Sequence, residues 1–221
     1  MYEHFGTVLS DFLRTPLRTE QSLIESIQVE DRGPFDEAIA MGKGVLVVTA
    51  HFGNWERIGH VVVSQGYSLT AVARDANQNA VQQRVHSLRE MTGMTILSRG
   101  DSARGLIRAL RANTLVAMLP DQNDDEVFVP FFGKPCGTVL GPAVLQQRTK
   151  CALLPAYCVR TGTDQYRVII RPLVNPDLKE TDLAVVTAKW MHELESAIKE
   201  YPEQYLWLHD RWKSARQRGM L

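Results

Sequence analysis

The sequence contains no apolar run long enough to cross a bilayer as a helix. A membrane-spanning helix needs about 20 mostly apolar residues, and no such stretch occurs in the 221 residues of the chain. The N-terminus also lacks the basic, apolar and small-residue regions that together make a secretory signal peptide. The sequence therefore predicts neither a membrane span nor a secretion signal.

Cysteine is scarce, and its positions argue against two common kinds of site. Cys136, Cys151 and Cys158 have neither the paired spacing of a zinc site nor the pattern of a disulfide framework. Cys151 and Cys158 lie in apolar stretches, so we expect buried free thiols and a reducing, cytoplasmic compartment. No histidine lies near the cysteines at zinc-finger distances, and we expect no metal.

A net charge of one sign is also missing, which argues against nucleic acid as a partner. Lys+Arg and Asp+Glu both number 25, so no long-range positive field surrounds the chain. The charge is uneven, however, because residues 51–120 hold eight arginines against four acidic residues. This distribution suits an anionic headgroup, an acidic carrier protein or a phospholipid surface. Solvated helix faces are the alternative explanation for most of these arginines.

Strands and helices are expected to alternate along most of the chain. The expected strands are 45–49, 68–73, 95–97, 114–119, 152–159 and 166–171. The expected helices are 36–41, 55–64, 77–91, 101–111, 142–148 and 181–201, and 128–133 is expected to be an aromatic loop. This alternation predicts a single α/β domain over residues 1–221, with a mostly parallel central sheet and helices on both faces.

The N-terminal segment 2–15 has an amphipathic helical pattern. Its apolar stripe consists of Phe5, Val8, Leu9, Phe12 and Leu13. We expect this helix to pack on the core or on a partner, with an interfacial membrane helix as the alternative. Two further segments are candidates for contact with an anionic bilayer, namely the exposed parts of the apolar loop 128–132 and the basic residues Arg211, Lys213, Arg216 and Arg218. The whole loop 128–133 is also a candidate lining for an acyl-chain groove, with core packing as the alternative.

The segment Val45–Glu56 is the most informative part of the sequence. An apolar strand ends near His51, a short Gly-Asn turn follows, and a helix is expected to begin at Trp55. Asn54 is of a type that caps helices, and Glu56 would lie in the first turn, where the helix dipole favours a carboxylate. Ligands and catalytic groups collect at the carboxyl ends of parallel strands.

A carboxylate that holds one nitrogen of a histidine ring leaves the other nitrogen free to act as a base. On one continuous helix, His51 and Glu56 would be separated by about 140° and would not share a face. Because His51 lies in the turn, we expect the turn to bring the Glu56 carboxylate within hydrogen-bonding distance of the ring. The alternative is that His51 only ends a strand and that Glu56 is a solvated helix residue.

His51-Phe-Gly-Asn-Trp-Glu56 resembles the His-x4-Asp/Glu motif of the lysophospholipid and glycerolipid acyltransferases. It is most similar to the late lipid A acyltransferases, the lauroyl and myristoyl transferases. Later segments match the same branch in the same order, and the resemblance covers roughly residues 18–215. These segments are Leu119-Pro-Asp121-Gln122, Phe128-Val-Pro-Phe-Phe-Gly133 with Gly141-Pro142, and Tyr201-Pro-Glu-Gln-Tyr-Leu-Trp207-Leu-His209-Asp-Arg211-Trp212-Lys213.

The resemblance implies a cofactor-free O-acyltransferase with a glycerolipid acyltransferase-like fold. His51, oriented by Glu56, would take the proton of an acceptor hydroxyl, which then attacks a fatty-acyl thioester. The donor would be an acyl carrier protein or coenzyme A thioester. The acceptor would be a membrane lipid such as a lipid A precursor, another glycolipid or a lysophospholipid. A non-catalytic lipid-binding module of the same fold and a thioester hydrolase are the alternatives.

The resemblance also implies further site residues and a location. Arg74 and Arg99 follow two strands at positions where arginines of the family line the site, to stabilise an oxyanion or hold a phosphate; ion pairs with neighbouring aspartates are the alternative. Asp121 and Gln122 are candidates for binding the substrate, or Asp121 for pairing with Arg99. Family members usually have an N-terminal membrane anchor, and residues 1–30 would form a helical segment in its place, either naturally or because the chain is a fragment. The implied location is peripheral, on the cytoplasmic side of the inner membrane.

Overall fold

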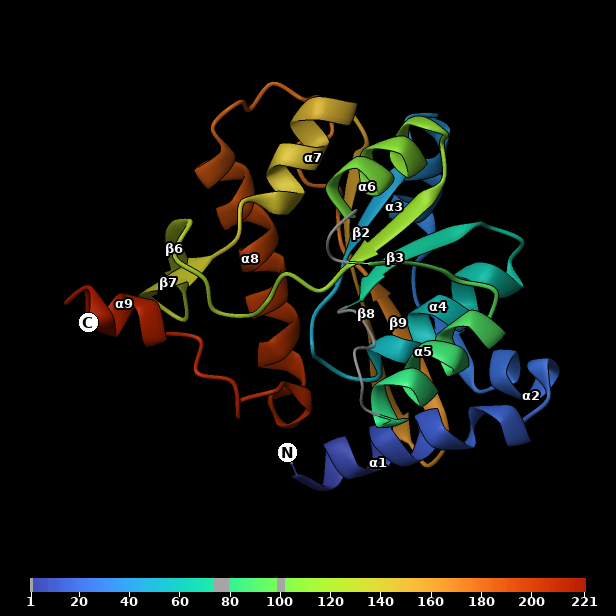
Figure 1. The fold of residues 1–221 in the computed structure, drawn as a ribbon. Coiled ribbons are helices and arrows are strands. Elements are labelled where there is room, and N and C mark those ends of the chain that lie inside the picture. The colour runs from blue at the N-terminus through green and yellow to red at the C-terminus, as the bar shows by residue number, and fades with distance from the viewer. Residues whose placement is uncertain (1, 74–79, 99–101) are drawn as a thin grey trace.

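A seven-stranded sheet runs through the middle of the molecule, with helices packed against both of its faces (Figure 1). The structure is a computed structural model that describes residues 2–73, 80–98 and 102–221. The sheet order is β1-β9-β8-β2-β5-β3-β4. The strands are β1 (Ile27–Val29), β2 (Val45–Val48), β3 (Leu69–Ala73), β4 (Thr95–Ser98), β5 (Leu115–Met118), β8 (Ala152–Gly162) and β9 (Gln165–Ile170).

The sheet is mostly parallel, as the sequence predicts. The strands β8, β2, β5, β3 and β4 all run in one direction, and only the β8–β9 pair is antiparallel. β2 lies in the middle with all of its residues buried. This explains why Val45–Val48 is a continuous apolar run, since a strand covered on both faces has no solvent side.

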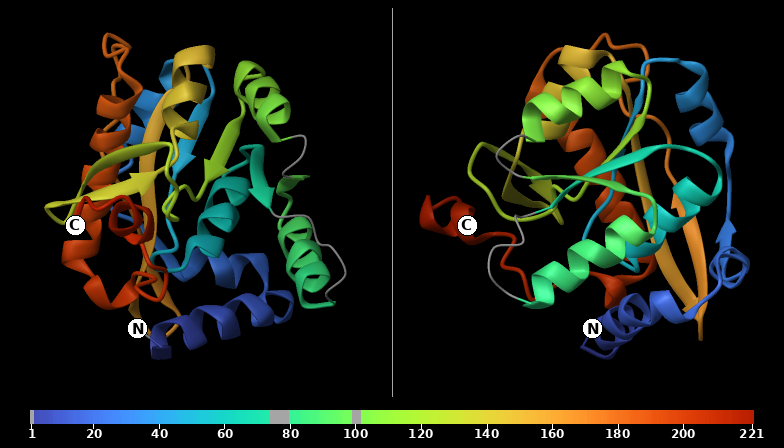
Figure 2. Two further views of the ribbon diagram at one scale, coloured as in Figure 1. Left: turned by 60° about the vertical axis from the view of Figure 1, so that its left-hand side comes forward. Right: turned by 45° about the vertical axis from the view of Figure 1, so that its right-hand side comes forward.

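Helices cover the two faces of the sheet in two groups (Figure 2). The side chains of β2 alternate between them, because Leu46 and Val48 pack toward one group while Val45 and Val47 pack toward the other. The first group is α6 (Ser102–Arg111), α7 (Gly141–Thr149) and α8 (Leu183–Glu200). The second group is α3 (Gly33–Ala40), α4 (Trp55–Ser64) and α5 (Ala80–Met91). The prediction of helices on both faces is therefore confirmed.

The prediction of an aromatic loop at residues 128–133 is wrong, because most of this segment is a strand. β6 (Val127–Phe131) pairs antiparallel with β7 (Lys134–Thr138) in a separate two-stranded hairpin. Phe132 and Gly133 have φ angles of 50° and 72°, as a tight two-residue hairpin turn requires. Phe131 is fully buried against Trp212 and Tyr205 and belongs to the core, whereas Phe128 and Phe132 are half-buried.

The N-terminal residues form α1 (Tyr2–Arg14), a short 3-10 turn (Thr15–Leu17) and α2 (Glu20–Glu25). The expected apolar stripe of α1 is divided between core and surface. Val8 and Phe12 are buried, whereas Leu9 and Leu13 are 56% and 49% exposed. Within the part of the chain that the structure describes, no helix is both long and apolar enough to cross a membrane.

The C-terminal segment returns to the end of β2. It consists of a 3-10 turn (Pro202–Gln204), a series of turns over residues 205–212 and α9 (Lys213–Gln217). The Leu206 N–H donates to the His51 carbonyl at 3.0 Å, and Tyr205 forms an isolated antiparallel bridge with Phe52. Residues far apart in sequence therefore hold the loop that follows β2.

Gly53 fixes the turn between β2 and α4. Its φ is +60°, in the left-handed region that glycine adopts without strain. A Cβ at this position would lie 2.0 Å from the carbonyl oxygen of Cys158 in β8, so no side chain fits. The Asn54 N–H also donates to this carbonyl at 2.6 Å, which keeps the turn against β8. The sequence predicts that the Asn54 side chain caps α4, and this prediction is wrong because that side chain makes no capping hydrogen bond.

We predict that Gly53→Ala destabilises the protein more than Gly42→Ala. Both glycines have a φ of +60°, so each variant loses about 1–2 kcal/mol for the left-handed backbone. Gly42 has no atom within 4 Å of an added Cβ, whereas the Gly53 variant must also separate the turn from β8, at a further cost of about 1–3 kcal/mol. Urea denaturation measures both losses, and equal values would contradict the close packing of this turn.

Candidate active site

His51 and Asp121 form a hydrogen-bonded pair at the carboxyl end of the parallel sheet. The His51 ring nitrogen Nδ1 lies 2.8 Å from Asp121 Oδ1, and the His51 backbone N–H donates to Oδ2 at 3.0 Å. The pairing follows from the sheet, because Val48 of β2 is in register with Met118 of β5. His51 and Asp121 each lie three residues beyond these partners, so neighbouring strands deliver them side by side.

The contact with Asp121 determines how the His51 ring can act. A carboxylate accepts hydrogen bonds, so the proton of a neutral ring lies on Nδ1 and the lone pair lies on Nε2. Nε2 has no hydrogen-bond partner among the described residues, and the His51 side chain is 24% exposed. Asp121 is only 2% exposed, and its two oxygens accept from the ring and backbone of the same residue. The ring is therefore oriented, with a basic nitrogen left open.

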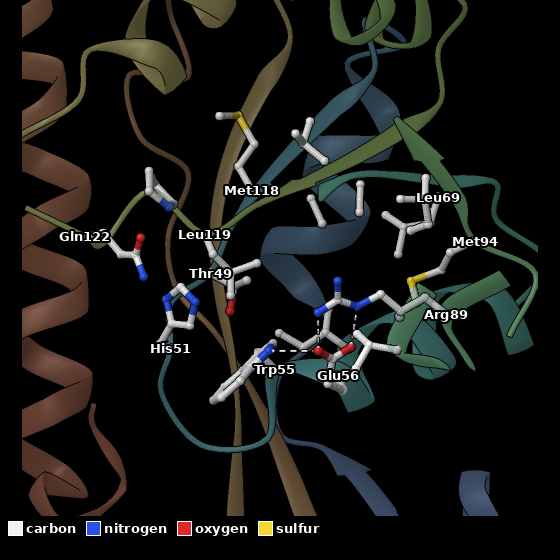
Figure 3. Close-up of a pocket in the computed structure, with 18 of the residues that line it drawn as sticks. Thr49, His51, Trp55, Glu56, Leu69, Arg89, Met94, Met118, Leu119 and Gln122 are labelled. Carbon is white, nitrogen blue, oxygen red and sulfur yellow. Dashed lines mark hydrogen bonds and ion pairs between the residues drawn. The ribbon is translucent and has the colours of Figure 1, made fainter. Parts of the chain in front are cut away.

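The prediction that Glu56 holds His51 is wrong in this structure. Glu56 instead accepts two hydrogen bonds from Arg89, at 3.0 and 2.5 Å, and one from the Trp55 ring nitrogen at 3.1 Å (Figure 3). Because α4 begins at Trp55, Glu56 points along the helix face toward α5, and the Trp55 ring lies against His51 with centroids 5.3 Å apart. Arg89, which sequence analysis missed, is thus the partner of the motif carboxylate.

The other predicted site residues have different outcomes. Arg74 and Arg99 lie outside the described residues. Gln122 is exposed and lines the same cavity as His51, beside which it lies in Figure 3. Asp121 was predicted to contact the substrate or Arg99, and in the structure it contacts His51.

A cavity of about 700 Å³ opens beside His51. It extends between the sheet and helices α4 and α5, and Leu69 and Met94 lie at the far end from His51 (Figure 3). The apolar side chains in its lining include Ile58, Leu69, Ala71, Val85, Met94, Ile96 and Ala117. An oriented base and a set of apolar side chains in one cavity suit a reactant with a polar reacting group and a hydrocarbon chain.

Thr49 is a further candidate that sequence analysis missed. It lies at the end of β2, two residues before His51, and lines the cavity. Its hydroxyl is buried and has no hydrogen-bond partner in the described ranges. Buried polar groups are normally paired, so the unpaired hydroxyl of a residue beside a cavity is a candidate for contact with a bound molecule. In the sequence, Thr49 was marked as a candidate only by its position at the end of the same strand that leads to His51.

The C-terminal segment also holds the loop that follows Asp121. His209 Nε2 accepts the backbone N–H of Asn123 at 2.7 Å, and the Asn123 side-chain oxygen accepts from the Ser214 backbone at 3.1 Å. Burial, together with the nearby Arg211 charge, lowers the pKa of His209, which favours the neutral ring that this acceptor role needs. The segment therefore acts as a structural lock on the site.

Several of the predicted surface groups are occupied elsewhere. Arg211 is 1% exposed and lies over the Phe131 ring, so its proposed contact with a bilayer is wrong. Arg216 and Arg218 form ion pairs with Asp210 and Asp125. These pairings reduce the free positive charge at the C-terminus.

The three cysteines are free and buried. Burial raises the pKa of Cys151 to about 11 and that of Cys158 to about 12, so both remain thiols at neutral pH. The expectation of buried free thiols at these two positions is confirmed. Over residues 2–73, 80–98 and 102–221, no group of three or more His, Cys, Asp or Glu side chains is arranged to hold a metal ion.

Comparison with known proteins gives a consistent picture. The model of a family described as bacterial lipid A biosynthesis acyltransferase matches residues 1–214. Phosphatidylinositol mannoside acyltransferase of Mycobacterium tuberculosis (strain CDC 1551 / Oshkosh) is 26% identical over 95% of this chain and 68% of its own length. Lipid A biosynthesis palmitoleoyltransferase of Escherichia coli (strain K12) is 29% identical over 84% of this chain and 61% of its own. Lipid A biosynthesis lauroyltransferase of the same strain is 33% identical over 54% of this chain and 40% of its own. The chain thus spans about two thirds of the length of the first two relatives.

Proposed function

The chain belongs to the bacterial lipid A biosynthesis acyltransferase family, and we propose on this basis that it is an O-acyltransferase acting on a membrane lipid. It moves a fatty-acyl group from an acyl thioester to a hydroxyl of the lipid. The observation that carries the proposal is the open Nε2 of His51, with Nδ1 held by Asp121, in the wall of a cavity of about 700 Å³ that many apolar side chains line.

The proposed reaction needs one base and no covalent enzyme intermediate. Nε2 of His51 takes the proton of the acceptor hydroxyl as its oxygen attacks the thioester carbonyl carbon. The buried Asp121 carboxylate stabilises the imidazolium ion that forms. The tetrahedral intermediate then collapses, the carbon–sulfur bond breaks, and Nε2 returns its proton to the thiolate. The products are an ester and a free thiol, so atoms and charges balance.

The oxyanion of this intermediate requires hydrogen-bond donors. The Thr49 hydroxyl supports this role because it is buried, unpaired within the described part of the chain, and lines the cavity that His51 lines. Arg74 and Arg99 remain proposed donors on the basis of the family resemblance alone. Glu56 is assigned a different role from the one first expected, since it holds Arg89 in the cavity wall.

The apolar part of the cavity is the proposed site of the donor acyl chain, and the donor is an acyl carrier protein or coenzyme A thioester. The relatives reported above are named for lipid A biosynthesis and for acylation of phosphatidylinositol mannoside, and both lipids are glycolipids. We therefore propose a glycolipid acceptor, with a lipid A precursor as the first candidate. Gln122, exposed beside His51, is available to contact it.

The outer face of α1 is the proposed contact with the bilayer. Tyr2, Leu9, Leu13 and Leu17 are all exposed and share one side of the N-terminal helix and its following turn. On the inner side, the Phe5 ring lies near the Trp55 ring, with centroids 6.0 Å apart. The Trp55 ring in turn contacts the His51 ring, with centroids 5.3 Å apart. A helix lying on the bilayer with this face would therefore bring His51 close to the acceptor lipid.

We predict that acyl transfer depends on His51 and Asp121 and much less on Glu56. His51→Ala should reduce kcat by about 10²–10⁴, as expected for loss of a general base. Asp121→Asn should cause a loss of similar order, since it removes the charge that stabilises the imidazolium. Glu56→Gln should cost less than about tenfold, because an uncharged side chain can still accept from Arg89.

The assay uses purified protein, acyl carrier protein and coenzyme A thioesters, and lipid A precursor, phosphatidylinositol mannoside or lysophospholipid as acceptors. Mass spectrometry follows the acylated lipid, and thiol release follows the donor. Thiol release without an acylated lipid would indicate a hydrolase. Lipid binding without any turnover would indicate a non-catalytic module.

We predict that the purified protein binds anionic liposomes through α1. Replacing Leu9, Leu13 and Leu17 together by Gln should weaken binding at least about tenfold, because burial of a leucine side chain contributes about 1.5–3 kcal/mol. The control is Val185→Gln on α8, a residue that is 39% exposed. Cosedimentation measures the binding, and equal losses in both variants would show that α1 is not the contact.

A further inference from the structure

A second apolar cavity, of about 130 Å³, lies beside the first. It lies between α3, α4 and strands β1, β2, β8 and β9 and is partly open to solvent, and most of its lining is apolar, including Val47, Val62, Leu154, Ala156 and Val168. Its polar side chains include Arg32, which donates to Gln65 at 3.2 Å and to the Tyr67 hydroxyl at 3.4 Å. A mostly apolar lining of this kind suits a hydrocarbon chain.

The two cavities lie over one face of the sheet. Ala71, Ala117, Val47 and Leu154 are paired in register across β3, β5, β2 and β8, so their side chains form one row on that face. Ala71 and Ala117 line the first cavity, whereas Val47 and Leu154 line the second. Adjacent strands are about 4.8 Å apart. The part of the sheet that lines the first cavity is therefore continuous with the part that lines the second, and the two parts meet between β5 and β2.

Ile58 of α4 lines both cavities. It is 4% exposed and belongs to the same core cluster as Val47 and Ala117, the adjoining floor residues of the two cavities. A β-branched side chain in a helix keeps essentially one χ1 rotamer, so Ile58 forms a stiff wall. Met94, at the far end of the first cavity, is by contrast an unbranched and adaptable side chain.

We propose that Ile58 is the partition that limits the length of the acyl chain, and that the second cavity receives the terminal carbons of longer chains when this partition is shortened. The inference rests on the proposed function, because it takes the first cavity to be the acyl-chain site. Ile58 is then a specificity-determining residue. A longer acyl chain would pass from the first cavity to the second along the sheet surface at β2.

The test compares saturated acyl donors that differ by two carbons, with one acceptor and kcat/KM as the readout. Ile58→Ala should move the optimum to longer chains and raise the relative use of the longer donors at least about tenfold, because each buried methylene contributes about fourfold. Ile58→Val should move it in the same direction by less, and it disturbs the fold least. Val62→Ala is the matched control, since Val62 lies one turn further along α4 and lines only the second cavity.

A compensating variant tests the destination of the chain. Ala156 lines only the second cavity, so adding Ala156→Leu to Ile58→Ala should return the optimum to that of the unaltered protein. Thermal melting shows that each variant is folded. A chain-length profile that does not change in folded Ile58→Ala and Ile58→Val would overturn the proposal, as would an equal shift in Val62→Ala.

Binding of non-hydrolysable acyl thioethers separates this inference from the proposed reaction. Calorimetry on the same variants should show the same change of preferred chain length without any turnover. If the unaltered protein binds these thioethers but transfers no acyl group from the thioesters, the proposed function fails while the partition is still tested. If no variant binds them with a dependence on chain length, the partition is overturned.

Discussion

The site depends on the register between β2 and β5. Val48 and Met118 are paired in register, so the loops that follow them begin at the same height of the sheet. His51 and Asp121, each three residues further along, are therefore close enough to form a hydrogen bond. A slip of one residue would reverse every side chain of a strand relative to its neighbour and would separate the pair. The buried Asp121 then accepts from both the ring and the backbone of His51, which fixes the orientation of the base. The chemistry thus follows from strand pairing in the core.

The remaining contacts keep these two loops in place. Leu206 holds the His51 loop and His209 holds the loop after Asp121, so one C-terminal segment spans both halves of the pair. Gly53 allows the His51 loop to lie directly on β8. The Glu56–Arg89 pair belongs to the wall of the cavity between α4 and α5. Each contact joins segments far apart in sequence, which explains why the site needs the whole sheet around it.

Much of the fold could be predicted from the sequence because apolar periodicity determines it. The six expected strands and the long helices occur close to their expected positions, since β2 is a continuous apolar run and α8 has a clear helical pattern. Short elements such as β1 and α2 were missed, as was the hairpin of β6 and β7, where Pro130 lies within a strand. Proline normally argues against a strand, and it is tolerated here because the hairpin is a separate two-stranded unit.

The partner of His51 could not be predicted in the same way. A motif gives the spacing along one segment and indicated Glu56, whereas the carboxylate that contacts the ring comes from another strand. Asp121 was recognised as a strand-end candidate, but its contact depends on a sheet order and register that the sequence does not state. Arg211 looked like a surface charge for the same reason, since its burial under the hairpin depends on distant residues.

The most direct test of the central claim is nitrogen and proton NMR of the His51 ring. We expect a hydrogen-bonded Nδ1–H signal that is lost or strongly shifted in Asp121→Asn and retained in Glu56→Gln. A signal that survives in Asp121→Asn but changes in Glu56→Gln would contradict the account, because it would show that Glu56 is the carboxylate that orients the base.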